Sequence, residues 1–416
     1  MRFHWFHLMP YQNLPDDFST TQSSVWVTVP SNLYDPLEGH RIYNEYLDEL
    51  EFADQVGFDG ICVNEHHQNA YGMMPSPNLM AATLARRTSN AAIVVLGNSL
   101  ALYNPPTRVA EEMAMLDVIS GGRLIAGFPV GTPMDTAYCY GQPPAIVREK
   151  YDEAHDLIMK AWTSEDVFSF NGKYTQLRYV NTWPKPIQKP HPPIWIPGSG
   201  SVETWEWSAK RDYLYSYLSF GGYKRAATLI QGYWDTLDRL GIEHNPNRVG
   251  YLQLVIVADT DAEAEKEYAQ HVQYFYDKCQ HIGPTWGAPG FRSIATLRSR
   301  GQEQFTERNS APPGPRIQAL STEKTWKERL ENGSIIAGSP ATVRDQLKDV
   351  IETMHVGHLM VLMQLGNMPK EKVLRSTELF AKEVMPHLRH YYSEYEDRWY
   401  PKPLSMDQRT APAPIA

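Results

Sequence analysis

The sequence predicts a single (β/α)8 barrel, an α/β fold in which parallel strands alternate with helices. Three observations favour this fold. Short β-branched or aromatic runs alternate with longer segments of helical period, eight such runs occur, and 416 residues is a length common for one barrel with insertions. We expect the barrel to occupy residues 1–400 and to be followed by a tail over 401–416.

The candidate strands share a short apolar core, and they are 3–7, 60–63, 92–96, 124–127, 193–196, 213–217, 249–258 and 358–362. Between them, 43–55 and 109–119 show helical spacing and stop before glycines. A doubly wound open sheet also alternates strand and helix, but it usually carries a glycine-rich turn after its first strand. Here Met9-Pro10-Tyr11-Gln12 follows instead, which favours the barrel.

Two long connections, about 12–36 and 281–325, interrupt the alternation. Connections of this length inside one domain are usually lids or disordered segments. Both are expected at the C-terminal face of the barrel, where barrel active sites lie. Aromatic residues of the first connection, Phe18, Trp26 and Tyr34, suit an apolar or aromatic substrate, or they pack the loop onto the barrel.

Composition excludes several functional classes. The net charge of -9, without a lysine or arginine run, argues against a nucleic-acid surface. No apolar stretch reaches the length of a membrane span and no signal peptide is recognisable, so we expect a soluble cytoplasmic protein with a small-molecule substrate. The three cysteines lie far apart, which indicates neither a disulfide framework nor a zinc site.

The most informative segment is Glu65-His66-His67, which follows an apolar strand. Alternation at a strand end would point some of these side chains into the barrel, where Glu65 could accept hydrogen bonds and His66 could exchange protons. The alternative is that the histidines cap the strand and bond to the backbone. A metal site is disfavoured because the spacing is not that of H-E-x-x-H on a helix.

Two further turns could approach a ligand. Gly97-Asn98-Ser99 ends the third strand with small residues that permit close approach of a planar ring. Gly198-Ser199-Gly200-Ser201 opens a helix, where free amides and hydroxyls suit a phosphate. Each also reads as an ordinary turn or capped helix start.

In this order, the segments resemble the bacterial-luciferase-like family of flavin-dependent monooxygenases. The resemblance spans most of the chain and is carried by 57–59, 65–67, 105–111, 116–123, Gly127, Gly131, 138–141, Arg148, 198–201, 338–340, 379–381 and 384–386. It implies a homodimeric barrel that binds reduced FMN supplied by a separate NAD(P)H:flavin reductase. In such enzymes the flavin reacts with O2 to form a C4a-peroxide that oxygenates a small organic substrate.

The resemblance also implies roles for individual residues. His66 matches the catalytic histidine and Glu65 the acidic residue beside the flavin ring, while His67 is less clearly placed. The implied cofactor-binding residues are Asn98 and Ser99 against the ring, with a cis peptide there, Tyr138 near the flavin tail, and Arg148, Gly198, Ser199, Gly200 and Ser201 at the phosphate. One departure is Val130, where luciferase itself has a phosphate-binding arginine.

Three alternatives remain open. An F420-dependent hydride-transfer enzyme shares the barrel and much of the pattern. A protein that binds flavin without catalysing a reaction could have the same barrel. A metal-dependent barrel hydrolase would need an adjacent same-face histidine pair on the first strand, but His4 and His7 point to opposite faces.

Overall fold

The structure is a computed structural model that describes residues 1–218, 220–283, 290–296 and 325–409. Eight parallel strands form a closed barrel, in which the last strand pairs back to the first. In barrel order they are β1 (Arg2–Phe6), β2 (Gly60–Asn64), β3 (Ala92–Leu96), β4 (Leu124–Gly127), β7 (Ile194–Gly198), β8 (Leu214–Tyr217), β9 (Val249–Val257) and β11 (His358–Leu362). All eight predicted runs are barrel strands, so the predicted fold is confirmed.

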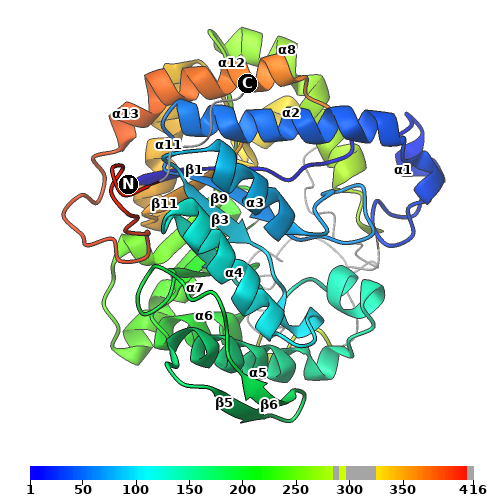
Figure 1. Cartoon of the computed structure of the whole chain (residues 1–416). Helices are drawn as coiled ribbons and strands as arrows, with labels where there is room; N and C mark the ends of the chain where they lie inside the picture. Colours follow the sequence, from blue (N-terminus) through cyan, green and yellow to red (C-terminus); the bar gives the residue numbers. More distant parts are fainter. Residues whose placement is uncertain (219, 284–289, 297–324, 410–416) are drawn as a thin grey trace.

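Three further strands were not predicted. β10 (Ile335–Gly338) pairs with the second half of β9, beyond the residues of β9 that pair with β8. It has four residues, as β4 and β8 do, and within the described chain it pairs with β9 alone, outside the closed ring of eight strands. β5 (Phe168–Asn171) and β6 (Gln176–Val180) form an antiparallel hairpin that lies outside the barrel, beside α5 (Figure 1).

Helices surround the strands on the outside of the barrel (Figure 1). They are α1 (Phe18–Thr21), α2 (Pro36–Gln55), α3 (Pro77–Arg87), α4 (Thr107–Ser120), α5 (Pro144–Thr163), α6 (Val202–Lys210), α7 (Tyr223–Leu240), α8 (Asp261–Tyr274), α10 (Trp326–Glu331), α11 (Pro340–Met354), α12 (Lys370–Leu379) and α13 (Met385–Leu388). Within the described residues, no helix is both long enough and apolar enough to cross a membrane.

The two helices identified from periodicity are both present, and both are longer than predicted. α2 starts at Pro36 because the carboxylate of Asp35 accepts the Leu37 amide at 2.8 Å, while proline favours the first helical turn. α4 ends at Gly121, whose φ of 69° suits a residue without a side chain. The first insertion, predicted over about 12–36, is followed directly by α2, which begins at Pro36. Most of the second insertion, 281–325, lies outside the described residues.

Side chains of β1 alternate between the barrel wall and its interior. Trp5 donates from Nε1 to Thr377 of α12 at 3.1 Å, and His7 lies 3.1 Å from Glu49 of α2. His4 instead points inward, where its ring stacks on that of His358. The predicted opposite orientations of His4 and His7 are thus confirmed.

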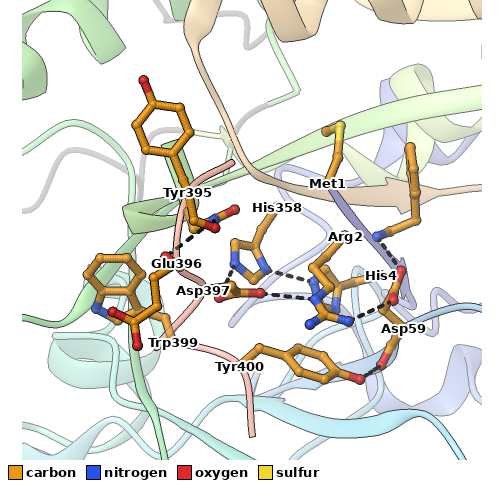
Figure 2. A network of polar contacts seen from close by, with 12 residues as sticks. Met1, Arg2, His4, Asp59, His358, Tyr395, Glu396, Asp397, Trp399 and Tyr400 are labelled. Atoms are coloured by element: carbon orange, nitrogen blue, oxygen red, sulfur yellow. Dashed lines mark hydrogen bonds and ion pairs between the residues drawn. The ribbon is translucent and has the colours of Figure 1, made fainter. Parts of the chain in front are cut away.

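A polar network closes the N-terminal end of the barrel (Figure 2). His4 Nε2 lies 3.0 Å from His358 Nδ1, His358 Nε2 lies 3.3 Å from Asp397, and Arg2 Nε donates to Asp397 at 2.9 Å. Because the carboxylate accepts from His358 Nε2, His358 Nδ1 must accept from His4 Nε2 when both rings are neutral. His4 Nδ1 is the exception in this network, because it is buried and has no hydrogen-bond partner among the described residues.

The segment after α13 is held against the same end of the barrel. Tyr400 donates to the Asp59 carbonyl at 2.7 Å, and Trp399 accepts from Trp195 Nε1 through its carbonyl at 2.9 Å. The predicted tail begins here, and its described part, 401–409, continues along this end, where the Leu404 amide donates to the Gly121 carbonyl at 2.9 Å. These contacts join the end of the described chain to the strands that begin it.

The buried His4 predicts an acid-sensitive contribution to stability. Burial, with the neighbouring His358 and Arg2, holds the pKa of His4 well below 6.5. The folded state thus keeps His4 neutral, whereas the unfolded chain takes up a proton below about pH 6.5, so stability is lost as the pH falls through that value. The stability difference between wild type and His4→Gln should shrink by about 1.4 kcal/mol per pH unit below 6.5. Urea unfolding at several pH values checks this, and a constant difference from neutral pH downward would contradict it.

Candidate active site

The predicted triplet Glu65-His66-His67 lies directly after β2, at the C-terminal end of the barrel. The side chain of His66 is 16% exposed, whereas those of Glu65 and His67 are almost fully buried. Of the three, His66 is therefore the residue best placed to meet a ligand. The other two make contacts within the protein.

Glu65 joins the ends of two neighbouring strands. One carboxylate oxygen accepts the Ser99 amide at 2.6 Å, and the other accepts the Tyr103 hydroxyl at 2.8 Å and lies 3.1 Å from His67 Nε2. Burial first, and then the charge of Glu65, raises the pKa of Tyr103, which stays protonated and donates. This geometry makes Glu65 a residue that positions the β3 end, while its predicted catalytic role stays a prediction.

His66 pairs with a carboxylate that the sequence analysis did not identify. Asp135 Oδ2 lies 3.1 Å from His66 Nδ1 and accepts the Thr132 hydroxyl at 2.9 Å, while its Oδ1 accepts the His67 amide at 2.8 Å. Because Asp135 is held on both oxygens, it fixes the His66 ring with the proton on Nδ1. The Nε2 lone pair is then available as a base.

Aromatic side chains cover the His66 ring. Trp26, from the first insertion, lies edge-on to it at 4.8 Å between centroids, and Tyr71 does the same at 5.1 Å. Trp26 and Tyr71 also stack on each other at 4.7 Å. Three aromatic residues of this insertion were candidates for contact with an apolar substrate. Trp26 reaches the candidate site, whereas Phe18 contacts His281 and Tyr34 contacts Tyr11.

The third-strand end differs from what the resemblance implies. The cis peptide bonds of the described chain all precede prolines, at Pro105, Pro184 and Pro190, so the expected cis bond at Asn98-Ser99 is wrong. Asn98 instead adopts a φ of 63°, and its amide pairs with that of Asn78 on α3 at 2.8 and 3.0 Å. This pairing turns the Asn98 side chain toward α3, and only the backbone remains for contact with a cofactor ring.

Arg148 and the turn after β7 form a polar cradle at the same end of the barrel. The Arg148 guanidinium donates to the hydroxyls of Ser201 and Thr204 at 3.4 and 3.3 Å, and among the described residues it has no carboxylate within ion-pair distance. A guanidinium that bonds only neutral hydroxyls beside a helix N-terminus fits an anion such as a phosphate. The predicted association of Arg148 with this turn is present in the structure.

Other members of the turn have different surroundings. The Gly200 amide already donates to the Tyr215 hydroxyl at 3.0 Å, Gly198 packs against the same ring, and Ser199 is exposed. Glu203 brings a negative charge, because its carboxylate accepts the Ser201 hydroxyl at 2.7 Å. Burial opposes ionisation of Glu203, but hydrogen bonds from Ser293, Ser201 and Thr296 lower its pKa to about 2. An incoming phosphate would have to displace this carboxylate from Ser201.

The structure thus groups the predicted residues into two clusters and leaves one outside both. Tyr138 is 46% exposed, in a π-helix over Met134–Cys139, and within the described part of the chain no hydrogen bond or ring contact ties it to either cluster. Asp135 lies in that same π-helix, four residues after Gly131. A carboxylate that closely follows a barrel strand was the signal that could have identified it.

The two clusters fit a phosphorylated cofactor with a flat ring. Arg148 and the hydroxyls of Ser201 and Thr204 would hold the phosphate, and the guanidinium, which forms no ion pair among the described residues, supports this assignment. His66, under its aromatic cover, would meet the ring or a substrate beside it. Among the described residues, no group of three histidine, cysteine or carboxylate side chains converges as a metal site would require.

Comparison with known proteins identifies the group to which this site belongs. The family model described as luciferase-like monooxygenase matches residues 18–356. The chain belongs to this family. Its homologues are flavin-dependent monooxygenases, which agrees with the resemblance inferred from the sequence.

The relatives of this luciferase-like protein described below have low sequence identity to it. The uncharacterized protein y4wF of Sinorhizobium fredii is 27% identical over 354 residues, which cover 84% of this chain and 93% of the relative. The oxygenating constituent of 3,6-diketocamphane monooxygenase from Pseudomonas putida, solved with FMN, shares the fold with a TM-score of 0.64 at 19% identity, covering 93% of this chain and 98% of the other. An F420-dependent secondary alcohol dehydrogenase also shares it, with a TM-score of 0.60 at 16% identity and coverages of 93% and 99%.

Proposed function

We propose that this luciferase-like monooxygenase is the oxygenase component of a two-component system. It would take reduced FMN from a separate NAD(P)H:flavin reductase and use O2 to oxygenate a small organic substrate. The observation that carries the proposal is the His66–Asp135 pair, a base of fixed tautomer under an aromatic cover, at the barrel end that also holds the Arg148 cradle.

Bound reduced FMN would supply the activation of O2. The residues of the chain would bind and orient it: Arg148 and Ser201 hold the phosphate, and the Glu65 contact fixes the Ser99 backbone near the ring. Trp26 and Tyr71 exclude water from the His66 ring, which limits loss of activated oxygen to solvent. His66 Nε2 takes up a proton or returns it, and Asp135 stabilises the protonated ring.

The first test is anaerobic loading with reduced FMN, followed by mixing with oxygen in a stopped-flow spectrometer. The proposal predicts that bound flavin reoxidises more slowly than free flavin. His66→Ala should still bind reduced FMN but should release most of the consumed oxygen as hydrogen peroxide. Coupling equal to wild type in this variant would remove His66 from the mechanism.

The same experiment separates the alternatives. If reduced FMN oxidises as it does in buffer while F420 binds, the protein is an F420-dependent hydride-transfer enzyme, since the Arg148 cradle would hold either phosphate. If FMN binds tightly but no oxidised product forms with any substrate, the flavin-binding protein without turnover is favoured. The fold similarity to an F420-dependent dehydrogenase is the reason to include F420 in the first screen.

We further propose that the protein is a homodimer that associates through α3 and α4. These neighbouring helices (Figure 1) expose Leu79, Met115, Val118 and Ile119, and each of these side chains is more than 40% accessible. Monomeric proteins rarely leave such an apolar face open to solvent.

Met115→Lys with Ile119→Lys should raise the dimer dissociation constant by roughly 100-fold, because like charges would meet across the interface. Sedimentation equilibrium measures this, with Trp183→Lys as an exposed control elsewhere. A monomeric wild type would contradict the proposal.

A further inference from the structure

Beside His66 lies a group of buried polar atoms that neither the cofactor cradle nor the His66–Asp135 pair uses. Trp26 is 1% exposed and Gln280 is 9% exposed. The indole nitrogen of Trp26 and both amide atoms of Gln280 have no hydrogen-bond partner among the described residues. Burial raises the pKa of Tyr71 and the neighbouring Gln280 amide lowers it, so Gln280 lies beside the Tyr71 hydroxyl, and Tyr71 stacks on Trp26. The unpartnered atoms therefore belong to one neighbourhood.

Three segments far apart in sequence hold this neighbourhood together. The Val25 amide donates to the His281 carbonyl at 2.7 Å, and the Ser24 hydroxyl donates to the Ile282 carbonyl at 2.6 Å. The Ala70 amide in turn donates to the Val25 carbonyl at 3.0 Å. Trp26, Gln280 and Tyr71 are consequently fixed relative to one another by backbone contacts within one or two residues of each.

A buried polar atom without a partner destabilises the fold, and native proteins rarely keep several in one place without a use for them. The atoms here combine two donor groups, the indole N–H and the amide NH2, with one amide oxygen. The surrounding surface is apolar, since Phe220 also packs edge-on against Tyr71 at 6.2 Å. Such a site is typical of recognition of a small molecule by one polar group and an apolar body.

Charge narrows the class of molecule. Among the described residues, no lysine or arginine stacks on the Trp26, Tyr71 or His66 ring, and Asp135 places a carboxylate 3.1 Å from His66 Nδ1. Lys278, two residues before Gln280, already donates to the Leu14 carbonyl and to Asp16. A carboxylate or phosphate on the substrate would lack a counter-charge there. A neutral acceptor can take the Trp26 N–H and the Gln280 amide without that cost.

We propose that Trp26 and Gln280 bind the carbonyl-type oxygen of a neutral substrate, whose apolar body lies against Tyr71 and Phe220 beside His66. This inference rests on the proposed function, because it places the substrate next to the base that the reaction uses. It assigns recognition to the first insertion and to residue 280, outside the barrel strands themselves.

Cyclohexanone and methylenecyclohexane test the proposal as matched probes, since they have nearly the same shape and only the first carries an acceptor. Their dissociation constants are measured by ligand-observed NMR with the full chain, both alone and loaded with FMN. We expect the ketone to bind at least about 10-fold more tightly, the value of one hydrogen bond to a buried donor. Trp26→Phe and Gln280→Met should each reduce this preference, and the exposed control Trp183→Phe should not.

A second measurement uses only the wild-type protein, so it does not depend on whether the variants fold. In the wild type, the indole N–H resonance of Trp26 should move downfield on addition of the ketone and stay in place with the alkene. Equal affinity for the two probes, absence of ketone binding, or a preference that survives both variants would overturn the inference. Failure of reduced FMN to bind, measured separately, would instead overturn the proposed function and leave a ketone preference intact.

Discussion

Asp135→Asn is expected to lower coupled turnover by about 100-fold while leaving FMN affinity nearly unchanged. Asp135 accepts from His66 Nδ1 and so keeps the Nε2 lone pair free, but it lies outside the Arg148 cradle. An asparagine that turns its NH2 toward Nδ1 would move the proton to Nε2 and remove the base. The measurement is the fraction of consumed oxygen that appears as product and as hydrogen peroxide.

The tautomer itself provides the control for this prediction. Nitrogen-15 NMR of the imidazole should show Nδ1 protonated in the wild type and Nε2 protonated in Asp135→Asn. Asp156→Asn alters a second histidine–aspartate contact, His155 Nδ1 to Asp156 at 3.1 Å, which is remote from the site and should leave turnover unchanged. Turnover of Asp135→Asn close to that of wild type would show that His66 needs no orienting carboxylate.

Arg148→Ala and Glu203→Gln are expected to change the affinity for reduced FMN in opposite directions. Loss of the guanidinium should weaken binding by about 1.5 to 3 kcal/mol, the value of a charge-assisted bond to phosphate. Removal of the Glu203 charge should strengthen binding several-fold, because the phosphate would no longer compete with a carboxylate for the Ser201 hydroxyl. Anaerobic fluorescence titration measures both constants.

Two nearby residues control for general effects of charge. Lys150→Ala, two residues along α5, removes a cation that bonds Gln142 at 3.0 Å. Glu206→Gln removes an exposed carboxylate of α6 that pairs with Lys210 at 2.7 Å. Neither should alter FMN affinity by more than about twofold, since exposed charges are screened. Unchanged binding in Arg148→Ala would reassign Arg148 to a structural role.

The barrel could be predicted from sequence because its strands are buried on both faces and therefore read as short apolar runs. β10 has four residues, as β4 and β8 do, and it was not predicted because eight other runs already completed the expected barrel. The predicted strand ends also gave the correct location of the candidate site, because His66 and Arg148 both lie at the C-terminal end of the barrel.

The side-chain partners could not be predicted, because they depend on contacts across the fold. Asp135 is 69 residues from His66, and Tyr103 reaches Glu65 from a segment 38 residues away. The family resemblance placed Glu65 and Asn98 beside the cofactor ring, whereas their hydrogen bonds turn both side chains to protein neighbours. Tyr138 matched by position, but the π-helix leaves it facing solvent.

The contacts that tie Asp397, Trp399 and Tyr400 to the first strands have a consequence for biosynthesis. β1 is synthesised long before its partner β11 and the residues that seal the barrel below it. Until β11 has been synthesised, the nascent chain therefore carries an open sheet with an unpaired edge at β1, a state prone to aggregation. Chains truncated before Asp397 should yield fragments that chaperones retain and proteases remove.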